Sequence, residues 1–111
     1  MKTFRYFSIP FAFVFIAYLP IVSSAQLISG GYYHSLAVCS DGTARSWGSD
    51  ASGQLGDDAN FAQKSTPVSV ASLTDITAIS GGGSYSLALK NDSTVWAWGS
   101  DFYGQLGDDA N

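Results

Sequence analysis

The fold is decided by a stretch that the chain carries twice: residues 28–60 read ISGGYYHSLAVCSDGTARSWGSDASGQLGDDAN, and residues 79–111 read ISGGGSYSLALKNDSTVWAWGSDFYGQLGDDAN. The two copies align without a gap at an offset of 51 residues and are identical at 21 of 33 positions. Such a period is typical of architectures in which each copy is one supersecondary unit packed against its neighbours. The sequence therefore indicates a repeat protein.

Each copy reads as short strands joined by tight turns. Strands are expected at 27–29, 34–39, 43–47 and 67–70 in the first copy, and at 76–80, 85–90 and 94–98 in the second. Leu36 and Val38 share one face of their strand, because strand side chains alternate with period two. Asp41-Gly42 supplies a hairpin turn, since this pair readily adopts positive φ. Ser93 stands in the place of this glycine in the second copy.

Four short strands per 51 residues are typical of a propeller blade. The expected fold is all-β, with β-propeller repeats of four-stranded antiparallel blades and fewer than two blades in this chain. Residues 26–78 form the first repeat, and residues 79–111 form a second, truncated repeat. Other blades of the same longer chain are therefore expected as neighbours.

Residues 1–25 have the three parts of a secretory signal peptide. Lys2 and Arg5 give a positive start, an uncharged apolar run covers 6–22, and Ser23-Ser24-Ala25 supplies small residues. Cleavage is expected between Ala25 and Gln26, which predicts a secreted, periplasmic or cell-surface protein with no membrane span afterwards. The alternative is an uncleaved anchor, although the apolar run is short for a hydrocarbon core of about 30 Å.

The rest of the chain is acidic. Residues 26–111 hold all nine acidic residues, every one an Asp, against three basic residues, so their net charge is 3 − 9 = −6. Nucleic-acid binding is not expected, because it requires Lys and Arg to neutralise phosphates. Cys39 is the only cysteine, so no disulfide forms within the chain. Asn91-Asp92-Ser93 matches the glycosylation sequon, which is used only in a eukaryotic host.

Two motif sets carry a family resemblance. The first copy has Gly30, Gly31, His34, Trp47, Gly48, Gly53, Gln54, Leu55 and Gly56, and the second has Gly81, Gly82, Trp98, Gly99, Gly104, Gln105, Leu106 and Gly107. With these motifs the chain resembles the repeats of the regulator of chromosome condensation family, which includes alpha-tubulin suppressor-like proteins. The resemblance implies a closed β-propeller of seven blades in the whole protein.

The resemblance suggests a non-enzymatic protein-binding platform, an inhibitor or an adhesion or scaffold module, whose protein partner is unidentified. Some secreted relatives inhibit secreted enzymes such as β-lactamases. One alternative is guanine-nucleotide exchange on a small GTPase, as in the founding members of the family, which the signal peptide and the acidic charge oppose. Another is a secreted hydrolase or lyase whose site lies in further blades.

No catalytic, cofactor-binding or metal-binding residues are assigned. His34 is the sole histidine, and without convergent partners a structural hydrogen bond is expected. Trp96 is interpreted as packing between blades; the alternative is a binding hot spot, since Arg45 occupies its place in the first copy. The repeated aspartates are interpreted as solvated turn residues, with calcium binding as the alternative. They are Asp50, Asp57, Asp58, Asp101, Asp108 and Asp109.

Overall fold

The computed structural model describes residues 1–4 and 27–109, and its regular elements are all β-strands. The strands are β1 (Lys2–Phe4), β2 (Ile28–Gly30), β3 (His34–Val38), β4 (Ala44–Gly48), β5 (Lys64–Ser69), β6 (Ile76–Gly81), β7 (Tyr85–Lys90) and β8 (Val95–Gly99). The described ranges hold no helix with the length and apolar character of a membrane span. The expected signal peptide, apart from residues 1–4, and its cut between Ala25 and Gln26 lie outside the described residues.

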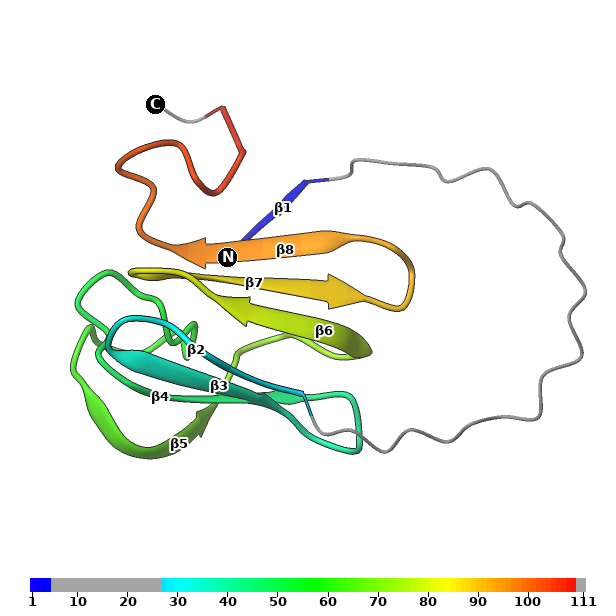
Figure 1. Ribbon diagram of the computed structural model, residues 1–111, viewed down its shortest axis with the longest axis horizontal. Helices are drawn as coiled ribbons and strands as arrows, with labels where there is room; N and C mark the ends of the chain where they lie inside the picture. The colour runs from blue at the N-terminus through cyan, green and yellow to red at the C-terminus, as the bar shows by residue number, and fades with distance from the viewer. Residues whose placement is uncertain (5–26, 110–111) are drawn as a thin grey trace, which may run out of the picture.

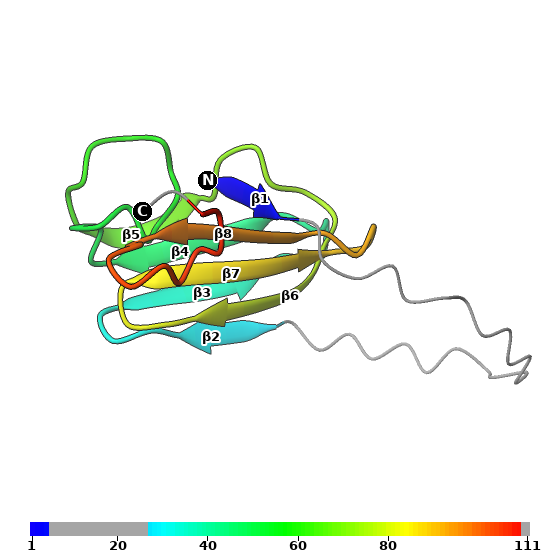
Figure 2. The same ribbon diagram turned by 90° about the horizontal axis from the view of Figure 1, so that it is seen from above.

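The strands form two four-stranded antiparallel sheets that stack face to face (Figures 1 and 2). We call them blade 1, with strand order β2-β3-β4-β5, and blade 2, with strand order β6-β7-β8-β1. The expected all-β architecture of four-stranded antiparallel blades is confirmed.

The two blades are equivalent in register. Ser35 pairs with Trp47 across β3 and β4, and Ser86 pairs with Trp98 across β7 and β8. Both residues of the second pair lie 51 positions after those of the first. The two copies therefore place the same sequence positions at the same points of two sheets, as the ungapped repeat predicts.

The fourth strand of blade 2 comes from the N-terminus. β1 pairs antiparallel with β8, with Thr3 opposite Trp96. In blade 1, β5 takes the corresponding place, with Ser69 opposite Arg45. An ion pair between Lys2 and Asp108 fastens β1 to the loop after β8 and raises the pKa of Lys2. Lys2 also fits the positive start of the expected signal peptide, so no local pattern in the sequence predicts this strand.

The β3–β4 and β7–β8 hairpins are closed by the same pair of hydrogen bonds. Thr43 donates from its backbone N–H (3.0 Å) and its hydroxyl (2.6 Å) to Asp41 Oδ1. Thr94 donates to Asp92 Oδ1 at the same two distances. These bonds lower the pKa of both aspartates. They also explain why β4 and β8 begin one residue later than the expected strands at 43–47 and 94–98.

The outer strand of blade 1 begins earlier than the expected strand at 67–70. Lys64 pairs with Gly48 after a shift in register between Ser46 and Gly48, so β5 starts at Lys64. Such an irregularity is a local feature of strand pairing that hydrophobic patterning does not reveal. Pro67 lies in this edge strand, where a missing N–H donor is tolerated.

The hydrophobic core lies between the blades. Blade 1 contributes Leu36, Val38 and Ala44 from β3 and β4, and β3 alternates buried and half-buried positions along its length. Blade 2 contributes Ala88 and Trp98, and Trp98 is 2% exposed. The core is completed by Val70, Leu73 and Ile76, with Ile79 and Trp96 packed at its margin. Burying a side chain the size of Leu36 contributes roughly 1.5–3 kcal/mol.

A buried polar network joins the blades across this core. The backbone carbonyl of Gln54, in the loop after β4, accepts hydrogen bonds from Ser86 Oγ and from Trp98 Nε1, each at 2.9 Å. His34 Nε2 lies 2.9 Å from Ser86 Oγ. The Ser86 proton is directed at Gln54, so we assign the Nε2–H tautomer to His34, with Nε2 donating to Ser86. His34 thus makes a structural hydrogen bond between the two blades.

Close approach of the blades requires glycine at two motif positions. A Cβ on Gly56 would lie 2.7 Å from Trp98 Nε1, and Gly56 has φ +65°. A Cβ on Gly31 would lie 2.1 Å from His34 Cε1 and 2.4 Å from the Gly82 carbonyl. These glycines therefore let the indole and the imidazole pack directly on backbone.

Replacing Ser93 by Gly should stabilise the protein. Ser93 has φ +66°, where the first copy has Gly42 with φ +80°. A left-handed conformation costs a non-glycine residue roughly 1–2 kcal/mol, and the extra chain entropy of Gly offsets part of this gain. We expect a net gain of about 0.5–1 kcal/mol in the free energy of unfolding, measured by urea denaturation. The matched variant Gly42→Ser should lose stability, and a loss in Ser93→Gly would contradict the account.

The protein should lose stability as the pH falls below 6.5, the ordinary pKa of histidine. Burial lowers the pKa of His34, with Asp50 opposing the shift. The unfolded chain therefore takes up a proton first, and the free energy of unfolding falls by at most about 1.4 kcal/mol per pH unit. Thermal melts of the wild type and of His34→Gln at pH values just below 6.5 should show this loss of stability with falling pH in the wild type alone. An equal slope in both proteins would exclude His34 as its cause.

Candidate protein-binding site

Four loops meet at one end of the blades, at the left in Figure 1, which we call the loop end. They are the segments 31–33, 49–63, 82–84 and 100–109. They meet because the start of β3 pairs with the end of β4, with His34 opposite Gly48, and Tyr85 pairs with Gly99 in the same way. The opposite end carries the short hairpin turns and the segment 70–75.

The motif residues lie at or next to the loop end, and several of them take part in the contact between the blades. The paired glycines follow or end β2 and β6, and each Trp-Gly pair ends β4 or β8. The Gly-Gln-Leu-Gly segments follow in the loops after β4 and β8. The structure thus brings Gly31, His34, Gln54, Gly56 and Trp98 together around the network between the blades.

The loop after β4 is held by its own hydrogen bonds. The Leu55 N–H donates to Asp50 Oδ1 (2.9 Å), and the Ser52 N–H donates to Gln54 Oε1 (2.9 Å). Leu55 is fully buried, and Asp50 is 2% exposed. Burial raises the pKa of Asp50, and the bond from Leu55 opposes that shift. Asp50 is therefore a structural residue of the loop, where the sequence analysis expected a solvated turn residue.

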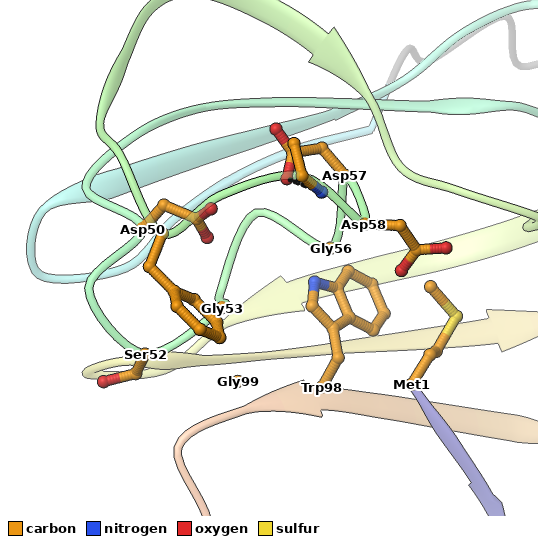
Figure 3. A pocket seen from close by; sticks show the side chains of 11 residues that line it. Met1, Asp50, Ser52, Gly53, Gly56, Asp57, Asp58, Trp98 and Gly99 are labelled. Atoms are coloured by element: carbon orange, nitrogen blue, oxygen red, sulfur yellow. Dashed lines mark hydrogen bonds between the residues drawn. The ribbon is translucent and has the colours of Figure 1, made fainter.

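A hollow of about 360 Å³ lies between this loop and the end of β8 (Figure 3). The indole of Trp98 lies beside the loop at Gly56, with Asp57 and Asp58 on the loop and Met1 close by. The side chain of Asp57 is 8% exposed and its Oδ2 lies 3.5 Å from Lys64 Nζ, so the expectation of a solvated turn residue is wrong for Asp57 as well. Asp58 is exposed. The hollow thus combines aromatic surface with carboxylates.

Five large aromatic side chains stand in solvent at the loop end. They are Tyr32 (81% exposed), Tyr33 (79%), Phe61 (71%), Phe102 (82%) and Tyr103 (87%). Tyr32 contacts Tyr33 edge to face, and Phe102 does the same with Tyr103 at 4.8 Å between ring centroids. Exposed aromatic groups of this size are typical of interaction surfaces. The loop end is therefore the candidate protein-binding site.

These aromatic residues are not among the candidate residues named from the sequence, although a comparison of the two copies points to most of them. Tyr32 and Tyr33 align with Gly83 and Ser84, and Phe102 aligns with Ala51. Tyr103 aligns with Ser52, so four of the five aromatic side chains stand where the two copies differ, and Phe61 follows the aligned stretch. Positions that break a repeat are free of its packing constraints and belong to surface loops.

The other candidate residues have structural surroundings. Trp96 is half-buried and packs against the core between the blades, with Lys90 Nζ 5.7 Å from its ring centroid. Arg45, at the corresponding place in blade 1, is exposed and donates to Ser69 Oγ (2.6 Å). Among residues 1–4 and 27–109, no group of three or more His, Cys, Asp or Glu side chains is placed to hold a metal ion.

Comparison with curated proteins shows similarity across the repeats. The chain is 45% identical over 84 residues to human HERC6, named a probable E3 ubiquitin-protein ligase, and this covers 74% of the chain and 8% of HERC6. It is 40% identical over 88 residues to the mitochondrial protein RUG3 of Arabidopsis thaliana, covering 78% and 19%. It is 38% identical over 79 residues to the regulator of chromosome condensation of Xenopus laevis, covering 71% and 19%. The chain thus spans a fifth or less of these relatives.

Solved structures with the same fold include human WBSCR16, with a TM-score of 0.67 and 26% identity over 76% of this chain and 22% of WBSCR16. Prp20p of Saccharomyces cerevisiae matches with a TM-score of 0.65 and 28% identity over 72% of this chain and 19% of Prp20p. Models of the regulator of chromosome condensation (RCC1) repeat match residues 25–54, 76–105 and 41–89. The chain belongs to the RCC1 repeat family, and its two sheets are propeller blades of that family.

Proposed function

We propose that this chain is a non-enzymatic protein-binding propeller module, which acts outside the cytoplasm as an inhibitor, an adhesion module or a scaffold. The observation that carries the proposal is the set of five exposed aromatic side chains at the loop end. Tyrosine and phenylalanine supply large, rigid contact surface at a small cost in conformational entropy. Because the loops lie outside the strand ladders, substitutions of their exposed residues leave the blades undisturbed.

The charge of the loop end favours a partner with basic side chains. Asp57, Asp58, Asp101, Asp108 and Asp109 lie in its loops around the aromatic residues. Two lysines lie at the starts of strands beside these loops, and both are already engaged: Lys64 by Asp57, Asn60 and the Ala62 carbonyl, and Lys2 by Asp108. Complementary charge steers association, and an aromatic face also attracts a cation directly. We therefore assign the partner a lysine- or arginine-rich segment.

The hollow beside Trp98 gives such a segment a point of attachment. Its volume is about 360 Å³, and its lining includes the exposed side chains of Asp58 and Phe61 beside the buried indole of Trp98. A lysine or arginine stem packs on apolar surface while its charged group stays near carboxylates. Support also comes from Prp20p, a 28% identical structure, described as binding the proteins Gsp1p and histones.

The test titrates the chain with a lysine-rich peptide and with a glutamate-rich peptide of equal length, by calorimetry at low and high salt. We expect binding of the basic peptide alone, weakened by salt because exposed charges are screened. Phe102→Ala combined with Tyr103→Ala should weaken binding about tenfold, as for residues near a binding hot spot.

A matched pair of variants separates the loop end from general acidity. Asp58 at the loop end and Asp75 at the opposite end are both exposed, with φ of 54° and 58°. Asn tolerates this conformation, so each Asp→Asn change removes one charge with little strain. Asp58→Asn should weaken binding, and Asp75→Asn should leave it unchanged. Equal losses in the two variants would overturn the proposed site.

Secretion is proposed on the positive start, the apolar run and the small residues before Gln26. We expect export to be accompanied by cleavage between Ala25 and Gln26, which removes β1 from blade 2. Mass spectrometry of the exported protein should therefore find Gln26 at the mature N-terminus. A mature protein that begins at Met1 would contradict this proposal and favour an uncleaved anchor.

A further inference from the structure

The hollow between the loop after β4 and the end of β8 lies where the two blades of this chain meet. Its lining includes Asp50, Asp57, Asp58 and Phe61 from the loop and Trp98 from β8. The hollow is therefore part of a contact within the chain, and it does not depend on what packs against the outer faces of the blades. Met1 also lines it, and the loss of Met1 on cleavage would widen the opening without removing these five side chains.

The carboxylates of the lining keep free acceptor capacity. Asp50 is 2% exposed, and within the described residues it accepts one hydrogen bond, at Oδ1 from the Leu55 N–H (2.9 Å). Asp57 Oδ2 has the ion pair with Lys64 at 3.5 Å but no hydrogen bond within residues 1–4 and 27–109. Asp58 is exposed, with both oxygens open to a donor. Burial raises the pKa of Asp50, because a buried carboxylate is costly unless a cation compensates it.

The neighbouring lysine does not fill this need. Lys64 Nζ donates its hydrogen bonds to the Ala62 carbonyl (2.7 Å) and to Asn60 Oδ1 (3.2 Å), and Lys64 does not line the hollow. Three carboxylates of the lining are thus served by one lysine that stands outside it. The hollow can therefore take a further positive charge from a partner.

The apolar part of the lining is aromatic. Phe61 is 71% exposed, and its ring lies beside Gly53, where a Cβ would stand 3.2 Å from Phe61 Cε1. The Trp98 N–H already donates to the Gln54 carbonyl (2.9 Å), so the indole offers the hollow only ring surface, beside Asp58 in Figure 3. Aromatic rings attract cations, and a flat cation also stacks on them.

We propose that the hollow selects arginine over lysine, and that one arginine side chain of the partner enters it. The guanidinium stacks on Phe61 and donates two parallel hydrogen bonds to Asp58, and its charge compensates Asp50 and Asp57. An ammonium group is a strongly hydrated point charge that cannot stack or form two parallel bonds, so lysine gains less. This selectivity rests on the proposed function, in which the loop end binds a basic segment.

The test compares two lysine-rich peptides of equal length that differ only at one central position, which is lysine in one and arginine in the other. Calorimetry with the full 111-residue chain should show that the arginine peptide binds about tenfold more tightly. A third peptide carries dimethylarginine at this position, which keeps the charge but blocks the two parallel bonds. It should lose most of the gain in affinity.

A matched pair of variants locates the selectivity. Phe61→Leu removes the ring and keeps apolar bulk, so the ratio of the two affinities should fall from about tenfold to about threefold or less. Phe102→Leu makes the same change at a phenylalanine that is 82% exposed and does not line the hollow. It should lower both affinities alike and keep their ratio. Both replaced side chains are exposed, so both variants should fold, which circular dichroism melts check.

The possible failures are distinguishable. Equal affinities of the lysine and arginine peptides for the wild type overturn the selectivity, while the loop end still binds a basic segment. A ratio that survives in Phe61→Leu, or that falls as far in Phe102→Leu, places the selectivity outside the hollow and also overturns the proposal. If neither peptide binds, the proposed function itself fails, and the arginine site fails with it.

Discussion

The structure depends on one buried acceptor, the backbone carbonyl of Gln54. It receives the hydroxyl of Ser86 and the indole N–H of Trp98 from the neighbouring blade, each at 2.9 Å. A buried carbonyl without donors is costly, by roughly 1–3 kcal/mol, so these two bonds fix how the blades face each other. The loop that presents the carbonyl is held in turn by Asp50, and Gly56 leaves room for the indole.

This arrangement gives several of the motif residues a structural role in the contact between the blades. The Trp-Gly pair of the second copy and the Gly-Gln-Leu-Gly segment of the first copy lie far apart in the sequence. They nevertheless form one contact, because the Trp of one blade packs against the loop of the blade before it. Conserving the strands and this contact leaves the loop end free to vary. In the loop after β8 the second copy has the exposed aromatic residues Phe102 and Tyr103, where the first copy has Ala51 and Ser52.

Much of the fold could be predicted from the sequence, because a 51-residue repeat with period-two alternation leaves few alternatives. The strands, the hairpin at Asp41 and the structural part played by His34 follow from local patterns. β1 could not be predicted, because three residues that pair with a strand over ninety positions away leave no local pattern, and Lys2 also fits the start of a signal peptide. The acceptor role of Gln54 was equally hidden, since it belongs to a backbone atom.

The account is tested most directly by a double-mutant cycle of Ser86→Ala and Trp98→Phe, followed by urea denaturation. Each single change leaves the Gln54 carbonyl one donor, whereas the double change leaves it buried with none. The double variant should therefore lose more stability than the sum of the two single losses, by about 1 kcal/mol. Losses that add to within about 0.3 kcal/mol would contradict the claim that this carbonyl couples the two blades.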